Sequence, residues 1–124
     1  MLVVWDSVWA TPKRTYFSPH EDGVVSMDIS PDGRYIVTLS YMSSSVSHQT
    51  ISLWDLHNEE LNEPIVTSTP IHSRDRRQHH VKFNTSNVEE IVTTGGSYDE
   101  ARNCVIFYSW KEGMDSFMYY NPDL

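Results

Sequence analysis

Histidine is the residue type that offers this chain its clearest candidates for metal chemistry. His72, His79 and His80 lie close together in the sequence, and His48 lies upstream of them. A metal site needs three or four ligands that converge on one ion. His79 and His80 are neighbours on a predicted strand and therefore point to opposite faces, so they cannot easily bind one ion together. We accordingly expect neither a metal nor another cofactor.

The sequence offers few groups for catalysis. Cys104, the single cysteine, begins a predicted buried strand, and nothing in the sequence pairs it with a base, which favours a small buried hydrophobe over a nucleophile. Glu59, Glu60 and Glu63 lie in a polar loop without an apolar pocket to raise a carboxyl pKa. The serine run 43–45 is typical of a solvated loop. We therefore expect no enzymatic activity.

Arginine is concentrated in one loop of an otherwise acidic chain. Arg74, Arg76 and Arg77 are three of the nine lysine and arginine residues, and the formal net charge is −8. The guanidinium group suits carboxylates and phosphates, and arginine is enriched at the energetic centres of protein interfaces. One interpretation is a partner-binding loop. The other is a solvated loop in which Asp75 screens the arginines.

Charge and composition restrict the partners. A chain with a pI near 5.0 lacks the basic surface of a nucleic-acid-binding protein. No apolar run reaches the roughly 18–20 residues of a membrane span, and no basic region precedes the apolar N-terminal residues as in a secretory signal. A single cysteine cannot form an internal disulfide, which suits a reducing compartment such as the cytoplasm. We expect other proteins as partners, and no nucleic acid, membrane or small-molecule substrate.

The stretch 24–55 indicates the elements that position these residues. Val25, Met27 and Ile29 alternate with polar residues, which is the period-2 pattern of a half-buried strand. Ser30-Pro31-Asp32-Gly33 is a tight-turn sequence, because proline pre-sets φ and glycine accepts a positive φ. Strands are expected over about 24–30, 35–40 and 50–55.

The rest of the chain continues in the same way. No stretch keeps apolar residues at helical spacing for three turns, so the sequence predicts an all-β chain of antiparallel meanders. The further strands are expected over about 2–6, 13–17, 64–69, 79–84, 89–94, 103–109 and 115–120.

Three of these strands end in a related way. Val3-Val4-Trp5-Asp6 and Ile51-Ser52-Leu53-Trp54-Asp55 both end in Trp-Asp, and Val105–Ser109 aligns with them if Tyr108 replaces the tryptophan. This pattern resembles the WD-repeat β-propellers, whose period is about 40–45 residues. The resemblance implies a propeller fragment of about two and a half blades of four-stranded antiparallel meanders. The expected units are a half blade at 1–17, a complete blade at 18–69 and a more divergent blade at 70–124.

The resemblance also implies structural roles for particular residues. In WD repeats a histidine of the blade-entry loop joins a hydrogen-bonded set with a strand-two serine or threonine, the tryptophan and an aspartate. Here His48 stands at the aspartate position, six residues before Trp54, which puts the complete set in doubt. The positions that match the WD pattern are His20, Thr38, Ser40, Trp54, Asp55, Trp5, Asp6, His72 and Tyr108.

A narrower resemblance covers nearly the whole chain. The segments VVWDS, TPKRTYF, SPDGRYIVTLS, QTISLWDL and VIFYSW, in this order, are similar to the cilia- and flagella-associated WD-repeat proteins of the calmodulin- and radial spoke-associated complex. That family implies a non-enzymatic scaffold of the axoneme that helps to attach radial spokes and supports motility. The partners it implies are the remaining propeller blades and axonemal or radial-spoke components. The alternatives are a microtubule-associated propeller of the echinoderm type and, less favoured, an enzyme on a propeller frame.

Overall fold

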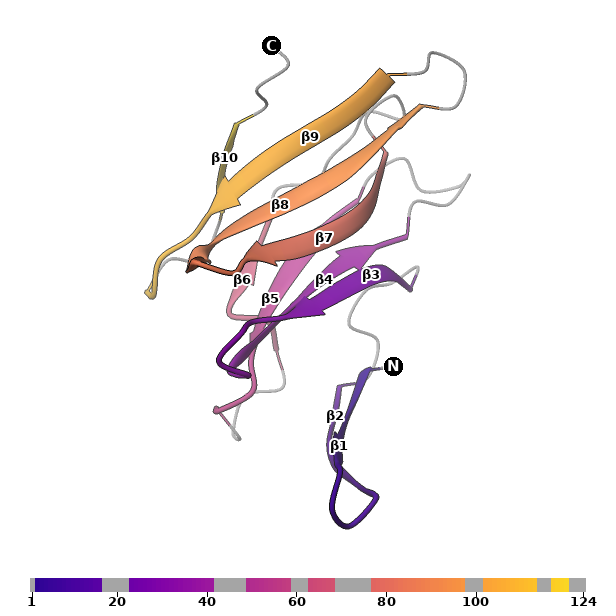
Figure 1. Ribbon diagram of the computed structural model, residues 1–124, viewed down its shortest axis with the longest axis vertical. Coiled ribbons are helices and arrows are strands. Elements are labelled where there is room, and N and C mark those ends of the chain that lie inside the picture. The colour runs from indigo at the N-terminus through magenta and orange to yellow at the C-terminus, as the bar shows by residue number, and fades with distance from the viewer. Residues whose placement is uncertain are drawn as a thin grey trace.

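The computed structural model consists of β-strands, turns and irregular segments. Ten strands form three antiparallel sheets, and no helix occurs among the residues that the structure describes (Figure 1). The prediction of an all-β, antiparallel chain is therefore confirmed. The described residues are 2–16, 23–41, 49–58, 63–68, 77–97, 102–113 and 117–120.

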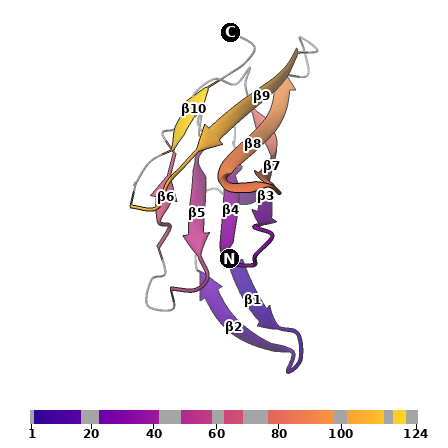
Figure 2. The ribbon, with the colours of Figure 1, turned by 60° about the vertical axis from the view of Figure 1, so that its left-hand side comes forward.

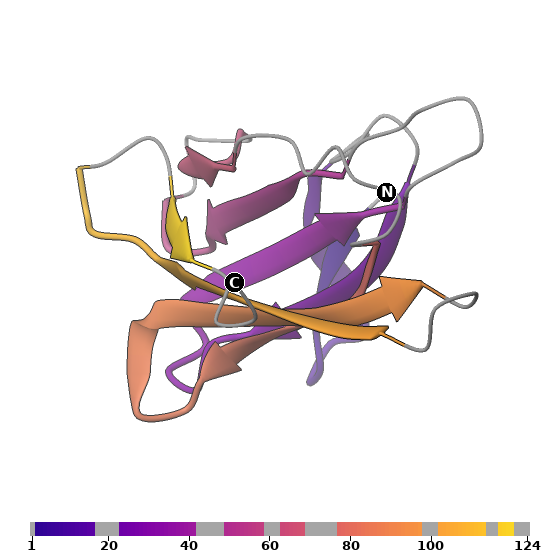
Figure 3. The same cartoon turned by 90° about the horizontal axis from the view of Figure 1, so that it is seen from above.

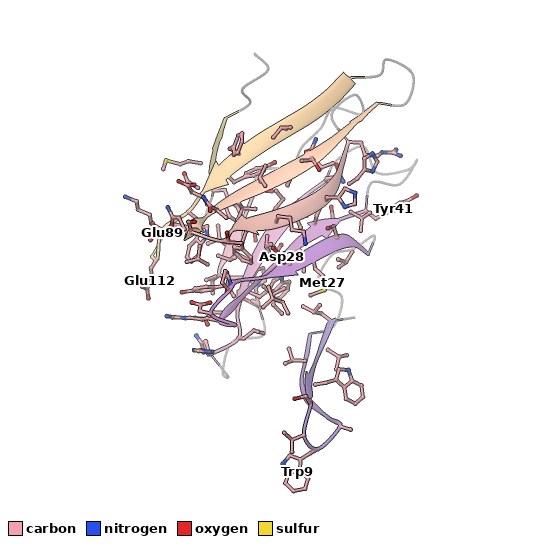
Figure 4. The ribbon with its side chains drawn as sticks, in the orientation of Figure 1. Trp9, Met27, Asp28, Tyr41, Glu89 and Glu112 are labelled. Carbon is pink, nitrogen blue, oxygen red and sulfur yellow. The ribbon has the colours of Figure 1, made fainter. Side chains whose placement is uncertain are left out.

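The N-terminal sheet is a two-stranded hairpin. β1 (Leu2–Asp6) pairs with β2 (Thr11–Tyr16), and Ala10 in the turn between them has a φ of 53°. The start of β1 contacts the rest of the molecule, and the turn projects away from it with Trp9 near its tip (Figures 1 and 4). A hairpin with so small a contact is marginally stable by itself.

The first four-stranded sheet contains β3 (Val24–Ile29), β4 (Tyr35–Ser40), β5 (Ile51–Asp55) and β6 (Val66–Thr67), in that order across the sheet. The tight turn between β3 and β4 forms where the sequence predicts it. Gly33 has a φ of 73° there, and its N–H donates to the carbonyl oxygen of Ser30 at 2.9 Å.

The second four-stranded sheet repeats this plan. It contains β7 (Gln78–Asn84), β8 (Asn87–Ser97), β9 (Arg102–Ser109) and β10 (Met118–Tyr120), again in sequential order. Each expected strand thus has a counterpart in the structure. The last strand of each four-stranded sheet is shorter than expected, and β8 is longer.

The two four-stranded sheets lie face to face as two layers (Figure 3). Tyr35, Val37 and Leu39 alternate along β4 and face the second sheet within the main core. Ile36 points to the opposite side and forms a second cluster with Leu2 of the hairpin. β4 is therefore buried on both faces, which accounts for its nearly continuous apolar sequence.

The two sheets have the same internal register. Ile36 pairs across strands with Trp54 in the first sheet, and Ile91 pairs with Tyr108 at the corresponding place in the second. Ile36 faces away from the second sheet, whereas Ile91 faces toward the first. The sheets therefore pack through opposite faces, in a head-to-tail series. A symmetric sandwich would instead use the same face of both.

The structure shows which face of β3 is the more buried. The alternation of Val25, Met27 and Ile29 predicts the strand correctly, but these apolar side chains form its more exposed face. Ser26 and Asp28 are the half-buried residues. The reason is that β3 is an edge strand whose polar face is turned toward β7, as the hydrogen bonds below show.

Gly95 allows β7 and β8 to approach closely at their ends. It pairs with Gln78 on one side and Cys104 on the other. A Cβ atom at this position would lie 2.0 Å from the carbonyl oxygen of Arg77 and 2.6 Å from the Cα of Gln78. No side chain fits there unless the backbone of β7 moves.

We predict that Gly95→Ala lowers the free energy of unfolding by about 1–3 kcal/mol, because β7 must shift to admit the methyl group. Thr94→Ala, at the exposed neighbouring position, is the control and should change it by about 0.5 kcal/mol or less. Urea unfolding measures both. Equal effects of the two substitutions would contradict the close approach.

Candidate protein-interaction site

The tryptophan next to the last residue of β5 is hydrogen-bonded to a threonine of β4. The indole Nε1–H of Trp54 donates to Oγ1 of Thr38 at 3.0 Å, and both side chains are buried. Thr38 lies two residues beyond Ile36, the cross-strand partner of Trp54, so the bond runs diagonally between the strands. Two residues of the WD pattern are thus brought together. Ser40 instead accepts the N–H of Thr50 at 2.8 Å.

Asp55 binds the turn that joins β3 and β4. The guanidinium group of Arg34 donates to its two carboxylate oxygens at 3.4 and 3.3 Å, and this pairing raises the pKa of Arg34. The same guanidinium lies 4.9 Å from the ring centroid of Tyr35. The pair is partly exposed, so it adds little stability. It positions the end of β5 against the turn.

Asp32 organises the turn itself. Its Oδ1 accepts the hydroxyl of Ser30 at 2.6 Å and the N–H of Arg34 at 3.1 Å. The hydrogen bond from Ser30 is the main cause that lowers the pKa of Asp32. Ser30 also accepts the N–H of Tyr35 at 2.9 Å, so one carboxylate and one hydroxyl hold the turn closed.

The second sheet has a different arrangement at the equivalent place. Tyr108 occupies the register position of Trp54, and its ring packs edge-on against Phe117 with centroids 5.9 Å apart. Thr93 occupies the position of Thr38, and its buried Oγ1 has no hydrogen-bond partner among the described residues. Trp110 follows the strand and donates its Nε1–H to the carbonyl oxygen of Val88 at 2.9 Å.

Side chains of β3 bind the backbone edge of β7. Ser26 Oγ accepts the N–H of Val81 at 3.2 Å, and Asp28 Oδ2 accepts the N–H of Phe83 at 2.9 Å. Figure 4 labels Asp28 on β3, beside β7. Asp28 also lies 3.9 Å from Nζ of Lys82. We call this pair of side-chain-to-backbone bonds the β3–β7 clasp.

A buried glutamine connects the same two sheets at their other end. Nε2 of Gln49 donates to the carbonyl oxygens of Ser40 and Gln78 at 3.1 and 2.8 Å, and Oε1 accepts the N–H of Gln78 at 2.7 Å. Neither this bridge nor the clasp was predicted from the sequence. The one available signal was a glutamine placed just before an apolar strand.

The structure places the other predicted residues as follows. His79 and His80 are successive residues of β7, and Cys104 lies within β9. Trp5 is exposed on β1, and Asp6 ends that strand. Arg77 is half-buried just before β7, and Glu63 is exposed. Residues that lie outside the described part of the chain are His20, Ser43–Ser45, His48, Glu59, Glu60, His72, Arg74, Asp75 and Arg76.

Two features are absent from the described residues. No group of three or more histidine, cysteine, aspartate or glutamate residues in the described ranges could hold a metal ion. Within the same part of the chain, no helix is long and apolar enough to cross a membrane.

Comparison with known proteins gives matches along the whole sequence, although no family model matches the chain. Cilia- and flagella-associated protein 251 of Tetrahymena thermophila is 35% identical over 124 residues, which cover 98% of this chain and 12% of that protein. The protein of the same name from Chlamydomonas reinhardtii is 33% identical over 135 residues, which cover 100% of this chain and 16% of that protein. The similarity runs from end to end. The chain spans a small part of the length of either relative.

Thr38 and Thr93 form a matched pair for testing the tryptophan–threonine bond. We predict that Thr38→Val lowers the free energy of unfolding by about 1–3 kcal/mol, because the buried indole N–H of Trp54 loses this acceptor. Thr93→Val should change it by less than about 0.5 kcal/mol or increase it, because its hydroxyl has no partner among the described residues. Chemical denaturation compares the two. Equal losses would contradict the assignment.

The turn carboxylate gives a pH-dependent prediction. A folded-state pKa lowered from 3.8 means that Asp32 contributes stability above that pH and loses the contribution as pH falls through the folded value. Asp32→Ala should therefore be less stable than the parent at about pH 6, and the difference should shrink below about pH 3.8. Urea midpoints at several pH values measure this difference. A difference that stays constant with pH would contradict the hydrogen-bonded carboxylate.

Proposed function

We propose that this chain is part of a protein-binding scaffold of the cilium or flagellum. The observation that carries the proposal is the end-to-end similarity to the Tetrahymena and Chlamydomonas proteins, both of which are named for their association with cilia and flagella. The cytoplasm and the axonemal cytoskeleton are the location that this role requires. Attachment of radial spokes, and through it support of motility, is the specific task that we assign to the scaffold.

The packing of the sheets supports a repeat architecture. The first four-stranded sheet presents one face to the preceding hairpin and the other to the following sheet, as a blade within a propeller does (Figure 2). Thr38 and Trp54 correspond to Thr93 and Tyr108 by register. We therefore propose that 18–69 and 70–124 are two WD-repeat blades and that 1–17 supplies half of another.

The described polar residues support binding and do not suggest catalysis. The buried side chains of Thr38, Ser40 and Gln49 are used in hydrogen bonds that hold strands and sheets together. A rigid frame of this kind presents its loops to other proteins. We propose that the chain works without enzymatic turnover, cofactor, nucleic acid or small-molecule substrate.

A segment exchange in Chlamydomonas tests the proposal. The part of the Chlamydomonas relative that matches this chain is replaced by the chain itself, in cells that lack their own copy. We expect the chimera to remain with isolated axonemes after detergent extraction and to co-purify with radial spokes. A folded chimera that is found entirely in the detergent-soluble fraction would contradict the proposed scaffold.

The basic loop is the proposed contact with the partner. In the chimera, replacing Arg74, Arg76 and Arg77 by glutamate should lower the axoneme-bound fraction at least tenfold, because arginine side chains often dominate interface energies. A matched control reverses three charges elsewhere, with Glu59, Glu60 and Glu63 replaced by lysine, and should bind as the parent does. Quantitative immunoblots of the two fractions give the result. Equal binding by both variants would indicate that this loop is only solvated.

A further inference from the structure

The turn between β1 and β2 exposes two large apolar side chains. Val8 and Trp9 have exposed fractions of 82% and 77%, the highest values among the large apolar residues that the structure describes. The turn lies at the end of the hairpin that is remote from the two four-stranded sheets (Figure 1), and Figure 4 labels Trp9 near its tip. We call Val8 and Trp9 the tip pair.

The positions of the tip pair are exposed in the other two sheets as well. The pair holds the third and fourth places after Trp5, the aromatic residue near the end of β1. The same places after the aromatic residues of β5 and β9 are exposed and polar, and they are held by His57 and Asn58 and by Lys111 and Glu112. β5 and β9 both lie inside four-stranded sheets. Exposure is therefore a property of this turn and does not arise from a missing neighbouring strand.

The turns after β1 and β9 also share a backbone feature. Ala10, the fifth residue after Trp5, has a φ of 53°, and Gly113, the fifth residue after Tyr108, has a φ of 87°. A Cβ atom makes this region unfavourable, so glycine is the usual residue there. The turn after β1 keeps the positive φ although it has no glycine. What differs between the two turns is the exposed pair, which is charged after β9 and apolar after β1.

An exposed tryptophan on a projecting turn is suited to anchor a partner protein. Polar residues serve at the equivalent positions of the other two sheets, so the fold does not require an apolar pair there. The large, rigid ring of tryptophan buries much apolar area on binding, and tryptophan is enriched among the residues that dominate interface energies. The tip pair therefore has the chemistry of an interface anchor.

The charge of the hairpin indicates the kind of partner. Its two strands carry Lys13 and Arg14 against the single anion Asp6, in a chain whose formal net charge is −8. A locally positive segment is complementary to carboxylates placed around one pocket. The continuous charge of an anionic membrane would instead repel the rest of the chain. A protein with a locally acidic surface fits both observations.

We propose that the tip pair anchors this chain in an apolar pocket of a partner protein, and that aspartate or glutamate residues form the rim of the pocket. The indole of Trp9 occupies the pocket, and Val8 packs beside it. The acidic rim faces the hairpin strand that carries Lys13 and Arg14. The inference rests on the proposed role in protein binding, but it concerns a different segment from the basic loop.

Two variants replace the tip pair with residue types that the other turns already carry. Val8→Lys with Trp9→Glu copies the turn after β9, and Val8→His with Trp9→Asn copies the turn after β5. Both pairs of residue types are exposed in turns of this structure, so the variants should fold as the parent does. Urea unfolding of the purified chains checks this, and one folded variant is sufficient for the comparison.

Photo-crosslinking from a neighbouring residue identifies what lies on the tip. A cleavable, thiol-directed crosslinker is attached at the exposed position Ser7→Cys, with Cys104→Ser removing the native thiol, so that the tip pair stays intact. The chain is added to demembranated axonemes of Chlamydomonas cells that lack the relative, and separately to the detergent-soluble extract of the same cells. Mass spectrometry maps the labelled peptides.

The proposal predicts that the label falls on one protein segment rich in aspartate and glutamate. Either replacement of the tip pair should lower this labelling at least about tenfold. Lys13→Gln with Arg14→Gln should lower it too, most clearly at low salt. Labelling of a segment without carboxylates, equal labelling after the tip pair is replaced, or no labelling in both fractions would overturn the proposal.

Two other occupants are tested with defined probes. Binding to vesicles of phosphatidylcholine and phosphatidylserine that is lost on replacing the tip pair would overturn the proposal in favour of a membrane. A dimer of the chain alone that is lost in the same way would overturn it in favour of a second copy. Labelling found only in the soluble extract would support the inference and contradict the axonemal scaffold. Axoneme binding without labelling would support the scaffold and contradict the inference.

Discussion

The structure depends on how the backbone N–H groups along the outer edge of β7 find hydrogen-bond partners. This edge lies within the interface between the two four-stranded sheets. Backbone N–H groups at a strand edge need partners when another sheet covers them. Ser26 and Asp28 supply these partners to Val81 and Phe83 from the neighbouring strand β3. Each such bond contributes about 0.5–1.5 kcal/mol, or somewhat more to a carboxylate. Burial of each large core side chain contributes about 1.5–3 kcal/mol. Apolar burial therefore supplies most of the stability, and the clasp fixes the register of one sheet on the next.

The two four-stranded sheets have different polar side chains at equivalent positions. The first sheet holds Trp54 with the hydroxyl of Thr38, whereas the second has Tyr108 and Thr93 at those positions. Trp110 compensates in part, because its indole bonds the carbonyl oxygen of Val88 and its ring meets Tyr35 of the first sheet edge-on at 5.0 Å. The repeated feature is the direction of packing. Sheets packed in series can keep that direction while individual hydrogen bonds change.

Strand positions and the tight turn could be predicted from the sequence, because alternation and turn residues act locally. The Ser30–Gly33 turn and the strands from β3 to β5 lie within about two residues of expectation. Alternation could not tell which face of β3 is buried, since that depends on β7, about 55 residues away. The WD resemblance implied a hydrogen bond between Trp54 and either Thr38 or Ser40. Only the structure shows that Thr38 is the partner. The Gln49 bridge has no local signature, because its partners belong to different sheets.

Amide hydrogen exchange at the clasp tests the head-to-tail packing most directly. Val81 and Phe83 lie on an edge strand, so without the first sheet their outward N–H groups would exchange rapidly. The structure predicts slow exchange at both residues in the parent chain. In a variant with Ser26→Ala and Asp28→Ala, the same two amides should exchange at least tenfold faster while the central strand β8 stays protected. Rapid exchange in the parent, or no change in the variant, would contradict the account.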